Sequence, residues 1–231
     1  MKRPACREAG LFVSFDEMVT LLLASASPRR QELIRLLGYP TAVQVPDVDE
    51  DSIDHADPAH NVVETARLKA EAVAATVMDQ AIIVAADTTV ALGREMLNKP
   101  ANAEEARHML RRLRGRTHQV HTGIVVVTLP ERRTAAAVST TAVTMRDYSD
   151  DEMEAYIASG DPFDKAGAYA IQNKAFRPVG ALAGCFTGVM GLSLCRLSQA
   201  LQAVGIPAEL DVANHDTARC ATCLAYVDTL F

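Results

Sequence analysis

The sequence predicts an α/β fold, because segments with the patterns of strands and helices alternate along its 231 residues. Hydrophobic residues make up 49% of the chain and charged residues 23%, a balance that supports a packed core and excludes general disorder. The length suits one large domain or two small lobes. No apolar run approaches the roughly 20 residues that a membrane-spanning helix needs, so no membrane partner is expected.

The first predicted unit is a buried strand followed by a helix. Residues 21–24 form a short apolar run, after which Ser27 and Pro28 suit the N-cap and first helical positions. Gly38 is a suitable end for this helix. The apolar stripe of the helix is Leu33, Ile34, Leu36 and Leu37.

The alternation continues through the rest of the chain. Residues 61–78 are Ala-rich and helical in pattern, and residues 81–86 form a β-branched strand that ends at the polar group 87–89. The remaining expected elements are a helix over 102–113 with the capping-box spacing of Asn102 and Glu105, strands 122–129 and 134–145 joined as a hairpin, a helix from Ser149 to near Gly160, and a helix over 194–203.

The net charge of −6 comes from one segment. The chain has 29 acidic and 23 basic residues, and six of the acids lie between Asp47 and Asp57. A protein that binds nucleic acid non-specifically usually has the opposite balance, because it neutralises phosphates with Lys and Arg. A nucleic-acid polymer is therefore not an expected partner.

The five cysteines do not suggest a disulfide scaffold in a chain of this length. No sustained apolar segment follows the basic start of the chain, so no secretory signal is expected and a reducing cytoplasm is the simplest compartment. Cys220 and Cys223 form a C-x-x-C pair with His215 nearby. A zinc site would need a fourth ligand and usually a second pair, so reduced thiols without a metal are the preferred interpretation.

The strongest local signal is the segment SASPRR, where a strand runs into a helix. Arg29 and Arg30 in the first turn oppose the helix dipole, at about 0.3–1 kcal/mol each, unless an anion binds there. Exposed backbone N–H groups, the hydroxyls of Ser25 and Ser27 and two guanidiniums together suit a phosphate. The alternative is a pair of solvated arginines on a surface helix.

Two groups of carboxylates are candidates for metal binding or catalysis. Asp87 directly follows an apolar strand, at the carboxyl end where α/β sheets usually bind ligands, although an Asp capping a turn is a common alternative. Asp49 and Glu50 belong to the acidic segment, which is either a solvated loop or a site for a hard divalent cation.

Several other polar residues are ambiguous when each is taken alone. Lys69 lies on the Ala-rich helix, Lys99 follows a short loop, and Lys165 adjoins Asp164. Gln172 can both donate and accept hydrogen bonds, as recognition of a base edge requires, but a lone Gln is usually a surface side chain.

Taken together, these pieces resemble the Maf family. The motifs in family order are SASPRR, PDVDE, ARLKA, AADTTV, LNKP, GRTHQVHTG and DPFDKAGAYAIQ. The resemblance covers residues 21–204, which leaves residues 1–20 as an N-terminal extension and 205–231 as a C-terminal tail. It implies an elongated mixed sheet flanked by helices, with two lobes around a central cleft. It also implies a homodimer that uses a divalent metal, Mg or Mn, to cleave nucleoside triphosphates to the monophosphate and pyrophosphate.

The resemblance also implies a subgroup. Members that cleave dTTP and UTP have Arg, Thr and Gln at three discriminating positions, which are Arg29, Thr88 and Gln172 in this chain. A Gln amide can pair with the N3–H and adjacent carbonyl of thymine or uracil. The chain departs from the family where Gly188 replaces an Asn and Ser193 replaces a Pro, which puts catalytic efficiency or base selectivity in question.

The resemblance assigns roles to the site residues. Asp87 would accept the proton of the attacking water and would bind the metal together with Glu50. Ser25 and Ser27 would orient phosphate oxygens. The triphosphate would be held by Arg29, Arg30, Lys69 and Lys99, with Lys165 as a further positive charge.

Two other functions stay open. A regulatory module could bind a nucleotide without hydrolysing it, with an influence on cell division as an example, and its basic cluster would look the same. A hydrolase with Cys185 as nucleophile is less favoured, because the sequence offers no His with an evident partner role.

Overall fold

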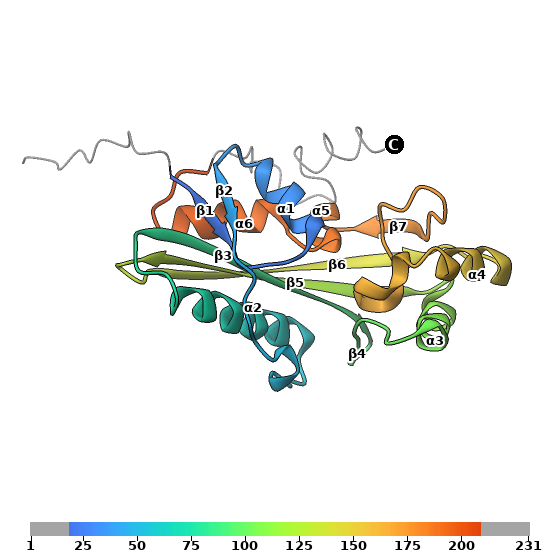
Figure 1. Ribbon diagram of the computed structural model, residues 1–231. Coiled ribbons are helices and arrows are strands. Elements are labelled where there is room, and N and C mark those ends of the chain that lie inside the picture. The colour runs from blue at the N-terminus through green and yellow to red at the C-terminus, as the bar shows by residue number, and fades with distance from the viewer. Residues whose placement is uncertain (1–18, 209–231) are drawn as a thin grey trace, which may run out of the picture.

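The computed structural model describes residues 19–208 and shows a mixed sheet with helices on both faces (Figure 1). The elements in chain order are β1 (Leu21–Leu23), α1 (Pro28–Arg35), β2 (Thr41–Val43), the 3₁₀ helix η1 (Glu50–Ser52), α2 (Pro58–Ala74), β3 (Ala81–Leu92), β4 (Glu95–Leu97), α3 (Ala103–Leu113), β5 (Thr117–Leu129), β6 (Thr134–Met145), α4 (Asp150–Ala158), the 3₁₀ helices η2 (Asp161–Asp164) and η3 (Ala166–Ala168), β7 (Val179–Ala183), α5 (Phe186–Met190) and α6 (Leu194–Ala203).

The seven strands follow the order β2-β1-β3-β5-β6-β7, and β4 pairs with β3. β1 is parallel to β2 and to the first part of β3, whereas β3, β5, β6 and β7 pair antiparallel. Figure 1 shows α2 on one face, α1, α5 and α6 on the other, and α3 and α4 at one end of an elongated molecule. The predicted α/β fold with an elongated mixed sheet flanked by helices is confirmed.

β3 is longer than its apolar run. The expectation that the strand ends at Asp87 is wrong, because β5 pairs with β3 from Ala81 to Ala91 and places Asp87 opposite Gly123. β5 itself begins at Thr117, before the predicted start. β1, however, pairs with β3 only as far as Val84. Asp87 therefore lies just beyond the carboxyl end of the parallel strand, within a strand that continues.

The helix caps follow the sequence closely. The side chain of Ser27 accepts a hydrogen bond from the backbone N–H of Arg30 at the start of α1. Asn102 accepts from the N–H of Glu105, but Glu105 accepts from the N–H of Ala101 instead of completing the capping box. α4 does have a complete capping box.

Some helix details differ from expectation. α2 begins at Pro58, because Asp57 supplies an N-cap, and it ends at Ala74. Leu36 is 46% exposed and leaves the predicted apolar stripe, since α1 ends at Arg35. The elements β2, β4, β7 and α5 have no more than five residues each and show no clear period in the sequence.

The predictions for the two ends of the chain fall mostly outside residues 19–208. Most of the N-terminal extension and the trio Cys220, Cys223 and His215 lie outside the described residues. Within residues 19–208, no helix is long and apolar enough to cross a membrane.

Gly123 lets α2 approach the sheet closely. A Cβ atom at this position would lie 2.4 Å from the backbone oxygen of Val62 in α2. Backbone cannot rotate away, so Gly123→Ala must push α2 off the apolar layer between α2 and the sheet. We expect the free energy of unfolding to fall by about 3 kcal/mol, measured by urea denaturation. Gly180→Ala is the control, because its Cβ would have 3.7 Å of clearance; equal stability of the two variants would contradict this packing argument.

Candidate active site

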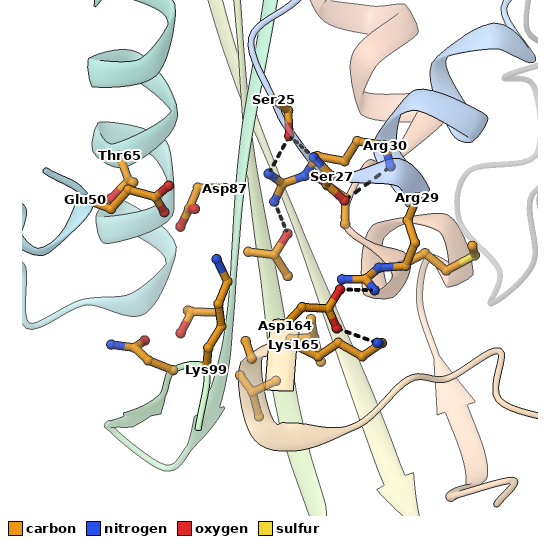
Figure 2. A pocket seen from close by; sticks show the side chains of 18 of the residues that line it. Ser25, Ser27, Arg29, Arg30, Glu50, Thr65, Asp87, Lys99, Asp164 and Lys165 are labelled. Carbon is orange, nitrogen blue, oxygen red and sulfur yellow. Dashed lines mark hydrogen bonds and ion pairs between the residues drawn. The ribbon is translucent and has the colours of Figure 1, made fainter. Parts of the chain in front are cut away.

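A cleft of about 860 Å³ opens over the middle of β3 (Figure 2). Its walls come from the β1–α1 turn, η1, α2, the segment around Lys99 and the stretch from η2 to Gln172. All the side chains to which the family resemblance assigns a role line it, whereas Asp49 and Cys185 do not. The residues with an assigned role are Ser25, Ser27, Arg29, Arg30, Glu50, Lys69, Asp87, Thr88, Lys99, Lys165 and Gln172.

The two long walls of the cleft differ in charge. Figure 2 shows the carboxylates of Glu50 and Asp87 on the side of α2, and Arg29 and Arg30 on the side of α1. The β1–α1 turn is held from within, because the Oγ of Ser25 accepts a hydrogen bond from the backbone N–H of Ser27 at 3.2 Å. A ligand in the cleft therefore meets hydroxyls and guanidiniums on one side, and carboxylates together with Lys69 on the other.

Arg30 is a fixed part of the basic wall. Its Nε donates to the backbone oxygen of Gly191 at 2.8 Å, Nη1 donates to Ser25 Oγ at 3.4 Å and Nη2 donates to Thr88 Oγ1 at 3.2 Å. Burial lowers the pKa of Arg30, and the negative charges of Asp87 and Glu50 oppose that shift. Since a guanidinium has five N–H groups, these three contacts leave two without a partner among them.

Lys69 joins the two carboxylates on the opposite wall. Its Nζ lies 2.8 Å from Glu50 Oε2 and 2.8 Å from Asp87 Oδ1, and its side chain is only 5% exposed. The sequence suggests Lys69 as a triphosphate ligand, whereas the structure places its ammonium between two acids. A cation at this point offsets the repulsion between the two carboxylates.

The far end of the cleft contains a second charged group. Lys165 Nζ lies 2.9 Å from Asp161 Oδ1 and 2.5 Å from Asp164 Oδ1, so the ion pair with Asp164 that the sequence leaves open is present. Arg29 also pairs with Asp164, at 3.0 Å, and thereby connects α1 to η2. Lys99 and Gln172 make no hydrogen bond or ion pair with any other described residue, which leaves both side chains available to a ligand.

Tyr156 and Tyr169 support the wall that contains Gln172, and the sequence alone does not single them out. The hydroxyl of Tyr156 donates to Asp161 Oδ2 at 2.9 Å and accepts from the backbone N–H of Ala170 at 3.1 Å. The hydroxyl of Tyr169 forms a hydrogen bond of 2.8 Å with Nε2 of His118, a residue of the GRTHQVHTG motif. Tyr169 lies within the motif DPFDKAGAYAIQ and Tyr156 shortly before it, but an aromatic residue at such a position is too frequent to be a specific signal.

His118 makes stability depend on pH. Burial lowers its pKa from 6.5 to about 4, so the unfolded chain takes up a proton at a higher pH than the folded chain does. Acidification from pH 6.5 to about 4 therefore favours unfolding, by about 3 kcal/mol in total. We expect His118→Gln to lose part of this dependence in urea denaturation between pH 6.5 and 5.

His121 keeps a residual slope in that variant, because burial lowers its pKa in the same direction. Equal slopes for the wild type and His118→Gln would contradict the assignment.

The departures at Gly188 and Ser193 are local. A Cβ at Gly188 would lie 2.9 Å from Ser139 Oγ, so a larger residue there requires Ser139 to move. Ser193 caps α6 by accepting from the N–H of Arg196 at 3.4 Å. Cys185 is the N-cap of α5 and is not one of the described residues that line the cleft, which gives no support to a thiol nucleophile.

Comparison with known proteins places the chain among nucleotide enzymes. Residues 20–204 match the family described as Maf-like protein. The chain is 40% identical to a dTTP/UTP pyrophosphatase of Desulforamulus reducens over 82% of this chain and 98% of that protein. It is 45% identical to the dTTP/UTP pyrophosphatase of Thermomicrobium roseum, over 82% and 86% of the two chains. It is 46% identical to the dTTP/UTP pyrophosphatase of Myxococcus xanthus, over 83% of this chain and 95% of that protein.

Proposed function

The chain belongs to the Maf family, and on this premise we propose that it hydrolyses dTTP and UTP to the nucleoside monophosphate and pyrophosphate. The observation that carries the proposal is the cleft in which Glu50 and Asp87 face Arg29 and Arg30. Cations on one wall neutralise a triphosphate. Carboxylates on the other wall repel a triphosphate, so their presence there indicates a role in catalysis or metal binding.

The acidic wall fits a divalent cation. Within residues 19–208 no cluster of three or more His, Cys, Asp or Glu side chains could form a metal site from protein ligands alone. Mg²⁺, however, is usually bound through one or two carboxylates together with substrate phosphates, and Glu50 and Asp87 already converge on one cation, the ammonium of Lys69. Glu50 and Asp87 would hold Mg or Mn, which when bound neutralises charge on the phosphate oxygens.

The residues of the cleft would also transfer the proton, bind the triphosphate and recognise the base. Asp87 accepts the proton of the water that attacks the α-phosphate. The triphosphate is held by Arg29, Arg30, Lys69 and Lys99, with Ser25 and Ser27 orienting its oxygens and Lys165 adding positive charge. Gln172 and Thr88 face the base. Phosphoryl transfer depends mostly on positioning and charge neutralisation, which such a set provides.

The compartment, the oligomeric state and the domain bounds that we propose follow from the family resemblance. The enzyme acts in the cytoplasm as a homodimer on free nucleotides, and a nucleic-acid polymer is not its substrate. Residues 21–204 form the catalytic unit, flanked by an extension and a tail.

The alternative function is a regulatory module that binds a nucleotide without turnover. In such a module Glu50 and Asp87 would weaken the binding of a triphosphate, because Lys69 offsets only one of their two negative charges.

Product analysis by ion-exchange chromatography separates the two functions. The protein is incubated with Mg²⁺ or Mn²⁺ and with dTTP, UTP, 7-methyl-GTP or a common triphosphate. Monophosphate and pyrophosphate from dTTP and UTP are expected. Binding by calorimetry without any product would support the regulatory module and refute the enzyme.

A further inference from the structure

Three side chains and a backbone oxygen form a hydrogen-bonded chain beneath the cleft. Arg30 Nη2 donates to Thr88 Oγ1 at 3.2 Å, Thr88 Oγ1 lies 2.9 Å from Thr122 Oγ1, and Thr122 Oγ1 lies 2.7 Å from the backbone oxygen of Gly188. The chain connects α1, β3, β5 and α5. Thr88 is half-buried and lines the cleft, whereas Thr122 is only 1% exposed.

The direction of every hydrogen bond in this chain is determined. A carbonyl oxygen can only accept, so the single proton of Thr122 points to Gly188. Thr122 must then accept from Thr88, which uses the single proton of Thr88. A guanidinium can only donate, so Arg30 occupies one lone pair of Thr88. Thr88 is left with one lone pair and no free proton.

We infer that Thr122 is a positioning residue for base selection, because it makes Thr88 act only as a hydrogen-bond acceptor toward the ligand. In this arrangement Thr88, in place of the Gln172 oxygen, accepts the N3–H of thymine or uracil, and the Gln172 amide donates to an adjacent carbonyl; cytosine instead presents a lone pair at N3. A donor facing Thr88 completes its hydrogen bonding, and an acceptor leaves two lone pairs opposed and unpaired. This inference deepens the proposed function and rests on it; neither the family resemblance nor the relatives' names assign a role to Thr122.

Thr122→Val tests the inference, because valine keeps the shape of threonine and removes its hydroxyl. Thr88 then has a free proton and can rotate to donate. We expect the ratio of kcat/KM for dTTP to that for dCTP to fall about tenfold, mainly through a lower KM for dCTP. Thr122→Ser keeps the hydroxyl and is expected to restore the ratio. In a Thr88→Val background, Thr122→Val is expected to change the ratio no further.

The matched control is Thr128→Val on the same strand. Thr128 is buried and its hydroxyl has no hydrogen-bond partner among the described residues, so this variant is expected to keep the wild-type ratio. An unchanged ratio in Thr122→Val overturns the inference. Equal shifts in Thr122→Val, Thr122→Ser and Thr128→Val also overturn it, because they would show a merely structural effect.

The same variants separate failure of the inference from failure of the proposed function. If the wild type releases no product from dTTP, the proposed function fails on its own. Base selection is then measured as the calorimetric affinity for dTMP relative to dCMP. A smaller dTMP preference in Thr122→Val than in Thr128→Val supports the inference, and equal preferences overturn it.

Discussion

Asp87→Asn is expected to lower kcat for dTTP by about 10²- to 10⁴-fold while nucleotide binding stays measurable. An amide has nearly the shape of a carboxylate but cannot take up the proton of the attacking water at neutral pH. Asp87 is also one of the two acids that converge on Lys69, 2.8 Å from its Nζ, so the variant removes one charge from the acidic wall. Steady-state kinetics and calorimetric binding of dTMP measure the two effects separately.

Asp79→Asn is the matched control, because Asp79 is exposed and precedes the same strand without lining the cleft. It is expected to have wild-type kinetics. Full activity in Asp87→Asn would remove Asp87 from the proton-transfer role. Loss of nucleotide binding in parallel with activity would instead indicate that the carboxylate mainly organises the cleft.

The sequence predicts the sheet and the longer helices well, because their signals are local. Ser27 and Pro28 mark the start of α1, and Ser149 marks the start of α4, by hydrogen bonds that reach only a few residues along the chain. The end of β3 depends instead on β5, more than thirty residues later in the chain, which pairs with Asp87 and Thr88 despite their polarity. A strand that is kept in place by a distant partner cannot be bounded from its own composition.

For the candidate site, the sequence likewise predicts what depends on local motifs and misses what depends on distant contacts. The motifs identify which side chains line the cleft, but they do not show how those side chains pair. The contact of Lys69 with Glu50 depends on how η1 lies against α2, and the contact of Arg29 with Asp164 depends on how α1 lies against η2. Thr122 stands within a recognised motif, but its role depends on the carbonyl of Gly188, 66 residues later. Such pairings are set by tertiary packing.

Lys69→Met is the second substitution with a large expected effect. The methionine matches the apolar stem of a lysine whose side chain is only 5% exposed, but it removes the ammonium that lies between Glu50 and Asp87. We expect kcat/KM for dTTP to fall by about 10²- to 10³-fold, because a preorganised positive charge is lost from the triphosphate site.

The same variant should bind Mn²⁺ more tightly than the wild type when no nucleotide is present. In the wild type the ammonium pairs with both carboxylates and offsets one of their two negative charges, whereas Lys69→Met removes this nearby counter-charge and leaves a metal ion without that competitor. Titration of free Mn²⁺ by electron paramagnetic resonance measures this affinity, with the exposed Lys174→Met as control. Weaker activity together with unchanged Mn²⁺ affinity would mean that Glu50 and Asp87 do not form the metal site. Stronger Mn²⁺ binding would support that site independently of turnover.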